Sequence, residues 1–411
     1  MLRTRRSSIA RSRHLFAALS LIVPVAAVQS QVPTVEPRAR TGEEVREQIR
    51  TALADIGRIV APNGIDEQRY LTLGGAKQWI MLRGQDRRAP VLLFLHGGPG
   101  SPISPVAYSY QRPWEDFFLV VHWDQRGFGR SLGTPEEAAK LKGTLNKEQV
   151  IRDAIELIEK LRTEFGQRKI VLVGQSWGTV LTLEIARRRP DLLHVAVTQG
   201  LAVNWLESPR ILYRRLLAAA EASGNTAEAQ RLREVGPLPP ASDPAALFAW
   251  SRKFGLGFPD STTWHNIKGA GDSWGRRMDA LEYVSPDYPA AAYAAAQAPD
   301  ADAMARYQEA MSPVLGWDAE RDVGTTFQVP LVVMQGDHDW QTNVDLARAY
   351  FRKVCAPYKK WVAFPHAAHA LNIEQPGVSV VALVNDVLPA VRGQVPAGAQ
   401  TCRGARRKAN N

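Results

Sequence analysis

The sequence predicts an α/β fold in which a mostly parallel β-sheet is flanked by helices and carries an inserted helical cap. Short, continuous apolar runs alternate with amphipathic stretches, as expected when strands are buried on both faces and helices cover them. One long interval then interrupts this alternation. The chain has 411 residues, 45% of them hydrophobic and 22% charged, which suits a globular protein and excludes collagen-like and disordered classes.

The predicted core covers residues 46–200 and 326–392. A Gly74-Gly75 turn joins two alternating segments within residues 68–83, which predicts a hairpin. Amphipathic periodicity predicts a helix over residues 149–165, and a second helix is predicted over residues 180–188, after the strand at 169–174. Buried strands are predicted at residues 91–95, 118–123, 169–174, 194–198, 330–334 and 360–364.

Residues 201–325 form the interval that we interpret as the cap. Helical patterns at 211–222 and 243–254 are separated by turn sequences at 223–225 and 237–240. A structureless loop of this length is improbable in a compact domain, so a helical insertion is favoured. The cap contains five tryptophans, which we expect to fill its own core, with one or two lining a substrate cleft: Trp205, Trp250, Trp264, Trp274 and Trp317.

The two ends of the chain read as segments outside the fold. Residues 1–30 contain a basic stretch, an apolar run interrupted by Pro24 and small residues, which predicts a secretory signal peptide. An uncleaved anchor is the alternative, although the run is short for a membrane span. Residues 31–45 are predicted to be a tether and residues 393–411 a flexible basic tail. We therefore expect an exported, periplasmic or secreted protein without stable membrane insertion after signal cleavage.

Two cysteines are present, Cys355 and Cys402. This number implies no disulfide framework. In an oxidising compartment the two could pair and fix the tail.

The net charge of +10 would by itself suggest a nucleic-acid or anionic-membrane partner. Residues 1–30 hold five arginines and residues 400–411 hold four basic residues, with no acidic residue in either segment. The remaining chain has a net charge of +1. Because the rest of the chain is nearly neutral, we predict a small-molecule or short-peptide substrate and no nucleic-acid partner. The sequence does not indicate an oligomeric state.

The strongest chemical signal is Gly174-Gln175-Ser176-Trp177-Gly178, which lies between an apolar strand and a helix. A serine nucleophile must stand on a tight, strained turn, and glycines two positions away on either side leave room for it. The following helix directs free N–H groups and its positive dipole end toward developing negative charge. We predict that Ser176 is a nucleophile; the alternative is a structural serine.

A serine nucleophile needs a base, and the base needs an orienting carboxylate. The loop after the second-last predicted strand contains Asp337 and Asp339, and the loop after the last contains His366 and His369. Both loops supply suitable residue types in a suitable order. The residues alone leave the choice within each pair open.

Three motifs together resemble the proline iminopeptidase branch of the α/β-hydrolases. They are His96-Gly97-Gly98-Pro99-Gly100, the sequence DQRGFGRS at residues 124–131, and the Gly-x-Ser-Trp-Gly elbow. The resemblance covers roughly residues 68–200 and 326–392. It implies an α/β-hydrolase fold and a Ser-His-Asp triad in the chain order serine, acid, histidine.

The resemblance selects one residue from each pair. The family acid lies in a Gly-x-x-Asp loop, which corresponds to residues 336–339 and favours Asp339. The family histidine comes five residues before a glutamate in a Glu-x-Pro context, which His369 and Glu374 match and His366 does not. Ala368 replaces the glycine that usually precedes this histidine.

The oxyanion of the reaction is expected at the backbone N–H groups of Trp177 and Gly98. The alternative for the glycine-rich loop is a simple tight turn. Asp124 and Arg126 are expected to brace neighbouring loops and not to contact the substrate.

These residues predict a serine hydrolase that cleaves an amide or ester bond through an acyl-enzyme, most similar to a proline iminopeptidase. A carboxylesterase or lactonase acting on a small apolar ester is the first alternative, and a non-catalytic small-ligand binder the second. The resemblance implies that an exopeptidase of this family recognises the free amine with acidic cap residues. The candidates, none of which lies in a matched motif, are Glu207, Glu221, Glu234 and Asp272.

No cofactor and no metal are predicted. The sequence lacks a phosphate-binding loop and a dinucleotide fingerprint. A metal site formed by Asp337, His338, His366 and His369 is disfavoured because their spacing matches no metal motif.

Overall fold

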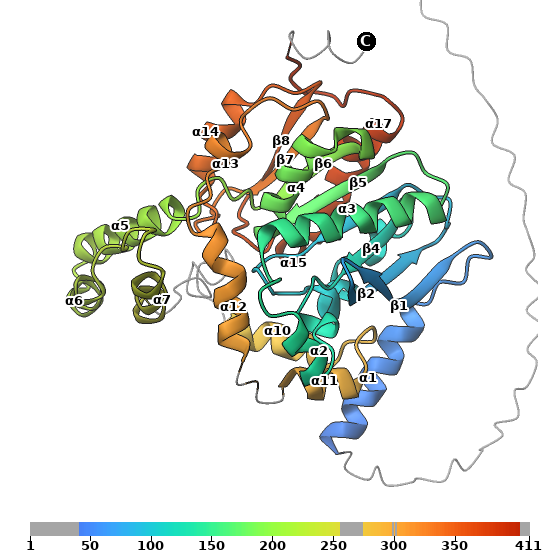
Figure 1. Ribbon diagram of the computed structural model, residues 1–411, viewed down its shortest axis with the longest axis horizontal. Coiled ribbons are helices and arrows are strands. Elements are labelled where there is room, and N and C mark those ends of the chain that lie inside the picture. The colour runs from blue at the N-terminus through green and yellow to red at the C-terminus, as the bar shows by residue number, and fades with distance from the viewer. Residues whose placement is uncertain (1–40, 255–273, 298–299, 301, 403–411) are drawn as a thin grey trace, which may run out of the picture. The chain divides into compact units, whose positions relative to one another are not determined.

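The computed structural model of the protein describes residues 41–254, 274–297, 300 and 302–402. Eight strands form one sheet in the order β1-β2-β4-β3-β5-β6-β7-β8, visible in the centre of Figure 1. The strands are β1 (Ile65–Leu73), β2 (Ala76–Gly84), β3 (Val91–Leu95), β4 (Leu119–Trp123), β5 (Ile170–Gln175), β6 (Leu193–Gln199), β7 (Leu331–Gly336) and β8 (Lys359–Phe364).

The sheet is mostly parallel, which confirms the predicted fold class. Strands β1 and β2 form the predicted antiparallel hairpin, and β2 is also antiparallel to β4. All the other neighbouring strands are parallel. The carboxyl ends of β3, β5, β6, β7 and β8 therefore meet at one edge of the sheet, where an open α/β sheet places its site.

Helices cover both faces of the sheet. They are α1 (Gly42–Ile56), α2 (Pro135–Lys140), α3 (Lys147–Glu164), α4 (Trp177–Arg188), α5 (Glu207–Ala222), α6 (Thr226–Val235), α7 (Pro244–Lys253), α10 (Trp274–Tyr283), α11 (Ala290–Gln297), α12 (Ala303–Met311), α13 (Ala319–Asp322), α14 (Val344–Lys353), α15 (Leu371–Glu374), α16 (Pro376–Ala382) and α17 (Leu388–Val391). The predicted helices at 149–165 and 180–188 are confirmed as α3 and α4.

Two hydrophobic cores lie on opposite faces of the sheet because successive strand residues alternate in direction. Leu93 and Leu172 point into the core that α3, α4 and α14 cover. Phe94 and Val173 point into the second core, which contains residues of the 104–114 segment and of α15, α16 and the following turns. Burial on both faces explains why these strands read as continuous apolar runs.

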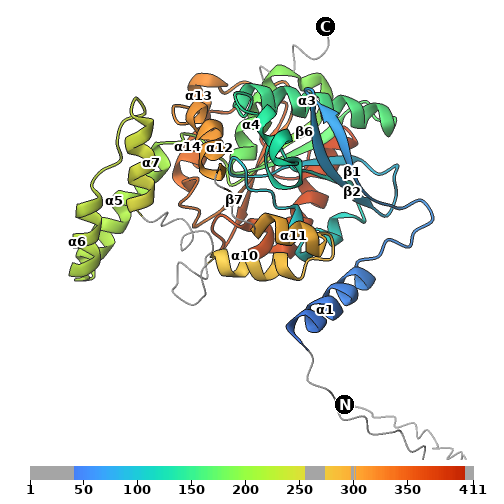
Figure 2. The ribbon, with the colours of Figure 1, turned by 60° about the horizontal axis from the view of Figure 1, so that its bottom comes forward.

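The described part of the interval between β6 and β7 is largely helical, as the cap prediction requires. Helices α5, α6 and α7 pack together around Leu212, Tyr213, Trp250 and Phe254 and lie side by side in Figures 1 and 2. Helices α10, α11 and α12 follow, and the short α13 lies between α12 and β7. The turns predicted at 223–225 and 237–240 separate α5 from α6 and α6 from α7.

The predicted N-terminal tether, residues 31–45, is too long at its C-terminal end. Helix α1 begins at Gly42, inside the segment 31–45 that was predicted to lack structure. The buried Arg46 side chain fixes this helix: its Nε donates to the Tyr283 carbonyl oxygen at 2.7 Å, and its guanidinium lies 4.3 Å from the Tyr283 ring centre. Such a cation–π contact depends on residues far away in the sequence, so local composition does not reveal it.

The prediction of a flexible tail from residue 393 is wrong as far as Cys402. Lys359 and Gln400 exchange backbone hydrogen bonds of 2.8 and 2.9 Å, and Cys402 forms a disulfide with Cys355. The tail is thereby attached to β8 as far as Cys402. Residues 403–411 lie outside the described part of the chain.

We predict that removal of this disulfide lowers the free energy of unfolding by about 2 to 4 kcal/mol. The bond closes a loop with a sequence separation of 47, and constraining the unfolded chain over such a loop gives at most about 4 kcal/mol. Urea unfolding of a Cys355→Ser/Cys402→Ser variant measures the change. Reducing the wild-type protein should reproduce it, whereas a variant with an unchanged midpoint would contradict it.

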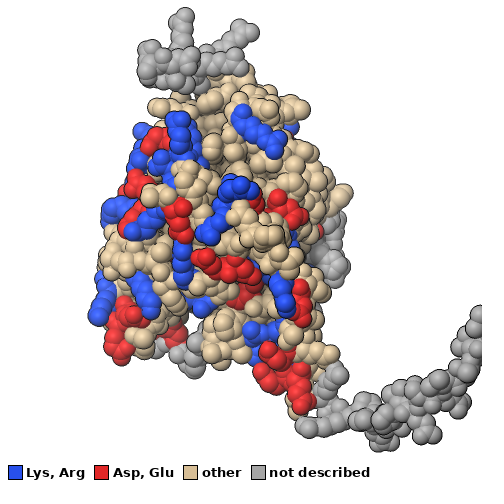
Figure 3. Space-filling model, turned by 90° about the vertical axis from the view of Figure 1, so that its right-hand side faces the viewer, with Lys and Arg blue, Asp and Glu red and all other residues tan. Residues whose placement is uncertain are grey.

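Charges of both signs are interspersed on the face of the molecule shown in Figure 3. Many charged side chains of the described chain are paired, for example Arg188 with Glu148 at 2.6 Å and Arg189 with Asp191 at 2.9 Å. This arrangement fits the near-neutral charge of the chain body. Within the described residues, we find no helix that combines the length and the apolar character needed to cross a membrane.

Candidate active site

Ser176 lies in the sharp turn between β5 and α4. Its backbone has φ 53° and ψ −116°, a conformation that costs energy for a residue with a Cβ atom. The flanking glycines allow the turn to close. A Cβ at Gly174 would come within 2.1 Å of the Gly178 carbonyl oxygen, and a Cβ at Gly178 within 2.1 Å of the Leu95 carbonyl oxygen.

Trp177 is the first residue of α4, so its backbone N–H has no acceptor within the helix. The indole is buried and its Nε1 donates to Gln125 Oε1 at 3.0 Å. This contact fixes the residue that carries the predicted oxyanion donor. The helix begins immediately behind Ser176, so its positive dipole end lies at the nucleophile.

The glycine-rich loop that follows β3 lies against Ser176. A Cβ at Gly97 would be 3.2 Å from Ser176 Cβ, and Gly98 has φ 111° and shares a cavity with Ser176. Only glycine adopts this backbone readily. The loop therefore brings its backbone close to the nucleophile, as an oxyanion donor at Gly98 requires.

His96 and Gln125 hold this loop in place. The backbone N–H of Gln125 donates to His96 Nε2 at 3.1 Å, and His96 Nδ1 lies 2.8 Å from the Gly97 carbonyl oxygen. These partners specify a neutral ring protonated at Nδ1. Burial lowers the pKa of His96 to about 4, so the ring stays neutral at neutral pH. Gln125 links this loop to Trp177, a role that the sequence analysis missed.

Asp339 and His369 form a buried pair at the ends of β7 and β8. Asp339 Oδ2 lies 2.9 Å from His369 Nδ1, and both side chains are nearly inaccessible to solvent. A donor at Nδ1 leaves Nε2 as the basic nitrogen of the ring. The pair thus has the base–carboxylate arrangement that a serine nucleophile needs.

Two neighbouring residues complete the hydrogen bonds of Asp339. Thr342 donates its backbone N–H to Oδ1 at 3.0 Å and its hydroxyl to Oδ2 at 2.8 Å. Gln335 Nε2 donates to Oδ2 at 2.9 Å, while Gln335 Oε1 accepts from the Leu201 N–H at 2.8 Å. Neither residue belongs to a motif that the sequence reveals. A glutamine at the end of an otherwise apolar strand was the available signal, because a buried amide must find partners.

The alternative acid and base lie elsewhere. Asp337 forms an ion pair with Arg348 at 2.7 Å, and both side chains are partly exposed. His366 is exposed and its ring stacks on His338 at a centroid distance of 6.5 Å. The structure therefore joins Asp339 with His369 and separates them from the other member of each pair.

The Gln199–Gly200 segment connects Ser176 with His369. The Ser176 N–H donates to the Gln199 carbonyl oxygen at 2.9 Å. Gly200 has φ 62°, and a Cβ there would lie 2.9 Å from His369 Nδ1 and Cε1. Nucleophile and base therefore flank the same short turn after β6, and only glycine leaves space for the imidazole.

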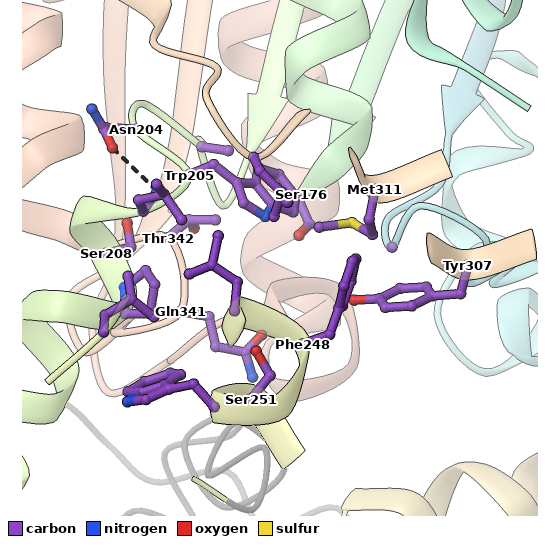
Figure 4. Close-up of a pocket in the computed structure, with 18 of the residues that line it drawn as sticks. Ser176, Asn204, Trp205, Ser208, Phe248, Ser251, Tyr307, Met311, Gln341 and Thr342 are labelled. Atoms are coloured by element: carbon purple, nitrogen blue, oxygen red, sulfur yellow. Dashed lines mark hydrogen bonds between the residues drawn. The ribbon is translucent and has the colours of Figure 1, made fainter. Parts of the chain in front are cut away.

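A cavity of about 280 Å³ opens from Ser176 into the cap (Figure 4). Thr342, which binds Asp339, also lines this cavity. Helices of the cap supply apolar walls, including Phe248 from α7 and Tyr307 and Met311 from α12. The volume is close to the lower end of small-molecule sites, which measure roughly 300–1,000 Å³.

Two of the five cap tryptophans, Trp205 and Trp250, line this cavity. Trp317 is buried in the core that covers α4. Trp264 lies outside the described residues, and Trp274 begins α10. The number of tryptophans that line the cavity beside Ser176 thus agrees with the one or two expected at a substrate cleft.

The candidate amine ligands are engaged elsewhere or not described. Glu207 pairs with Arg214 at 3.0 Å, and Glu221 pairs with Arg233 at 2.6 Å. Glu234 accepts from Gln230 at 3.1 Å. None of these three lines the cavity, and Asp272 lies outside the described residues.

Asp124 and Arg126 brace loops, in agreement with their predicted structural role. Asp124 accepts from the Ser104 hydroxyl at 2.6 Å and from the Arg130 N–H at 2.9 Å, and burial raises its pKa to about 6. Arg126 binds both carboxylate oxygens of the buried Asp153, at 2.7 and 2.9 Å. A bidentate pair of this kind holds the loop in a defined geometry.

A buried histidine in β4 is expected to make the fold sensitive to acid. His122 in β4 packs against Phe94 with tilted rings at a centroid distance of 5.0 Å, and within the described structure its Nε2 has no hydrogen-bond partner. Burial, assisted by nearby His96, lowers the pKa of His122 to about 3. The unfolded chain takes up this proton near pH 6.5, so stability falls as the pH falls from 6.5 toward 3.

We predict that His122→Phe reduces this acid sensitivity. The substitution keeps an aromatic ring against Phe94 and removes one titrating group, so the slope of unfolding free energy against pH should decrease by at most about 1.4 kcal/mol per pH unit. Urea unfolding at pH 7, 5.5 and 4.5 gives the slopes. A His366→Asn variant, altered at an exposed site, should keep the wild-type slope; an equal slope in His122→Phe would contradict the prediction.

Among the residues that the structure describes, no cluster of three or more histidine, cysteine, aspartate or glutamate side chains is placed to hold a metal ion. His338 and His366 stack on one another, whereas His369 is bound to Asp339.

Comparisons with known proteins place the chain in a family. The sequence signature described as "Alpha/beta hydrolase family" matches residues 92–383. The chain is similar to the probable aminopeptidase YbaC of Bacillus subtilis, with 27% identity over 75% of this chain and 92% of that protein. It is also 36% identical to a proline iminopeptidase of Neisseria meningitidis, over 27% of this chain but only 32% of that relative.

Solved structures show the same fold. A proline iminopeptidase-related protein from Thermus thermophilus superposes with a TM-score of 0.56 and 24% identity, covering 79% of this chain and 99% of that protein. At this identity the likeness concerns the fold alone. With the eight-stranded sheet, the elbow at Ser176 and the match over residues 92–383, the chain belongs to the α/β-hydrolase family.

Proposed function

We propose that this α/β hydrolase is a serine hydrolase that cleaves an amide or ester bond with Ser176 as nucleophile, His369 as base and Asp339 as the orienting acid. The observation that carries the proposal is the buried Asp339–His369 pair, whose partner Thr342 lines the same cavity as Ser176. The aminopeptidase relatives support a hydrolytic reaction on an acyl bond.

The reaction follows from these positions. Ser176 Oγ attacks the substrate carbonyl carbon while His369 Nε2 removes its proton, and Asp339 stabilises the imidazolium. His369 then gives the proton to the leaving nitrogen or oxygen, and the acyl-enzyme forms. Water, deprotonated by the same imidazole, hydrolyses the acyl-enzyme and restores Ser176.

The developing oxyanion is accommodated by the backbone N–H groups of Trp177 and Gly98. The indole contact with Gln125 and the adjacent His96 hydrogen bonds support this assignment because they fix both donor segments before substrate binds. Fixed donors avoid reorganisation during the reaction, and one such donor typically contributes about 10²- to 10³-fold in kcat.

Two substrate classes have specific support. The relatives named aminopeptidase and proline iminopeptidase favour a short peptide with a free N-terminus. The apolar walls of the cavity favour a carboxylic ester or lactone with a small apolar acyl group.

We also propose that the protein is exported. The basic and apolar pattern of residues 1–30 supports export, as does the Cys355–Cys402 disulfide, because such bonds persist in oxidising compartments. N-terminal sequencing of protein recovered from the periplasm or the medium tests this proposal. Recovery of the full-length chain from the cytoplasm alone would contradict it.

Labelling with a fluorophosphonate tests the reaction class. We expect one adduct per folded chain, located at Ser176 by peptide mass spectrometry, and no adduct after unfolding. Absence of labelling in the folded protein would refute the serine-hydrolase proposal and would favour a non-catalytic small-ligand binder.

A further inference from the structure

The cavity beside Ser176 has uncharged and largely apolar walls. Its outer part is formed by Leu238, Leu247, Phe248 and Trp250 around α7, with Met304 and Tyr307 of α12. In the described part of the chain every residue that lines the cavity is uncharged at neutral pH. Figure 4 shows aromatic rings from α7 and α12 facing the space in front of Ser176.

We propose that this cavity binds an uncharged, apolar acyl group, so that esters and amides of such acids are preferred to substrates with a free α-ammonium group. The inference rests on the proposed function, because it assigns the acyl group that Ser176 would receive. It goes further by choosing between the two supported substrate classes.

An ammonium group transferred into these walls would lose its hydration without gaining a carboxylate. Burial of an unpaired charge is strongly unfavourable. Several polar side chains that line the cavity already have partners: Asn204 Nδ2 donates to Asp318 at 2.8 Å, and Ser208 Oγ accepts from the Asn343 N–H at 3.3 Å. Thr342 gives its hydroxyl hydrogen to Asp339.

Three glutamates of the described cap form ion pairs with arginines. Glu207 lies 3.0 Å from Arg214, Glu221 lies 2.6 Å from Arg233 and Glu228 lies 2.7 Å from Arg231. Reorienting any of them toward the cavity would break an existing ion pair. The cavity walls themselves therefore provide dispersion and hydrophobic contacts, which suit an alkyl or cycloalkyl group.

Tyr307 offers a neutral polar contact in these walls. It packs edge to face with Phe248 at a centroid distance of 6.3 Å, and its hydroxyl is directed toward that ring in Figure 4. Burial raises the pKa of Tyr307, so the phenol stays protonated. A protonated phenol can donate to a neutral oxygen atom, and although its own oxygen can accept from an ammonium group, it supplies no negative charge to balance that group.

A pair of substrates that differ only at the amine position tests the proposal. Prolyl p-nitroanilide carries a ring ammonium, and cyclopentanecarbonyl p-nitroanilide replaces that group with CH₂ while keeping the leaving group. We expect kcat/KM at pH 6 to be at least tenfold higher for the cyclopentanecarbonyl compound. A higher value for the prolyl compound would overturn the inference.

The pH dependence of the kcat/KM ratio, prolyl over cyclopentanecarbonyl, gives a second readout. Titrations of the enzyme cancel in this ratio, so it follows the substrate amine, whose pKa is about 8. If only the neutral amine enters the cavity, the ratio should rise about tenfold per pH unit between pH 5.5 and 7.5. A ratio that is constant or falls with pH would show that the ammonium form binds, and would overturn the inference.

Ser251 provides a matched pair of variants because it belongs to α7 and lines the cavity. Ser251→Asp introduces a carboxylate, and Ser251→Asn is nearly isosteric with that variant but neutral. We expect the Asp variant to shift the preference toward prolyl p-nitroanilide by at least fivefold relative to the Asn variant at pH 6. Equal preferences would contradict binding of the acyl group against α7.

Fluorophosphonate labelling of Ser176 in the same preparations separates the two proposals. If Ser176 fails to react, the proposed function itself fails. If Ser176 reacts and the prolyl compound is preferred at pH 6, the serine-hydrolase proposal stands and only the inference about the acyl group is wrong. An Asp272→Asn variant that loses such a prolyl preference would identify Asp272 as the amine ligand.

Discussion

Ser176→Ala is expected to lower kcat by about 10⁴- to 10⁶-fold, because removal of the nucleophile leaves only transition-state binding by the rest of the site. KM should change little, since the Oγ atom contributes little to ground-state binding. The smaller side chain keeps the Cβ on the strained turn and leaves the close approach of Gly97 intact. The measurement is the initial rate with the best chromogenic substrate, at enzyme concentrations that reveal residual turnover.

A matched control distinguishes chemistry from loss of fold. Ser223 lies in the turn after α5 and donates to the Ala220 carbonyl oxygen at 3.2 Å, away from the cavity. Ser223→Ala should keep kcat within a factor of two. Both variants should show the wild-type thermal midpoint; a Ser176→Ala protein that is folded and more than one-tenth as active as wild type would refute the nucleophile assignment.

The sheet could be predicted from the sequence because its determinants are local. Strands buried on both faces need continuous apolar runs, and β3, β5 and β7 consist of little else. The Gly74-Gly75 turn marked the hairpin for a similar reason, since its two positive φ angles favour glycine. Helix α4 began three residues earlier than predicted because the helix starts directly behind Ser176.

The surroundings of the acid could not be predicted, because they depend on contacts between distant segments. Gln335 connects Asp339 with Leu201, which is 134 residues away in the sequence. Gln125 similarly joins the loop at His96 to Trp177. No periodicity encodes such hydrogen bonds; they exist because buried amides must be satisfied once the strands are in place.

Composition alone misplaces the boundaries of the fold at both ends of the chain. Helix α1 has a weakly hydrophobic sequence. Its buried Arg46 side chain contacts the rings of Tyr283 and Tyr293 and so holds the helix in place. The tail from residue 393 is rich in small and polar residues, yet Cys402 and the backbone pairing of Gln400 attach it to the sheet. In both cases contacts with distant residues order the segment, although its local sequence has little tendency to form regular structure.

Asp339→Asn is expected to lower kcat by about 10³- to 10⁴-fold while the fold is retained. The carboxylate accepts from Thr342, Gln335 and His369 at once, and an amide cannot accept at both of its terminal atoms. With an NH₂ group facing His369, the ring would have to accept at Nδ1 and carry its proton at Nε2. This tautomer cannot remove the Ser176 proton.

Asp337→Asn is the matched control, because it makes the same chemical change two residues earlier. Asp337 is paired with Arg348 on the surface, and loss of an exposed ion pair changes stability by less than about 1 kcal/mol. We expect Asp337→Asn to keep kcat within a factor of two, and kcat/KM measured for both variants decides between the two aspartates. A large loss in Asp337→Asn with retained activity in Asp339→Asn would move the acid of the triad to Asp337, even though the buried partner of His369 is Asp339.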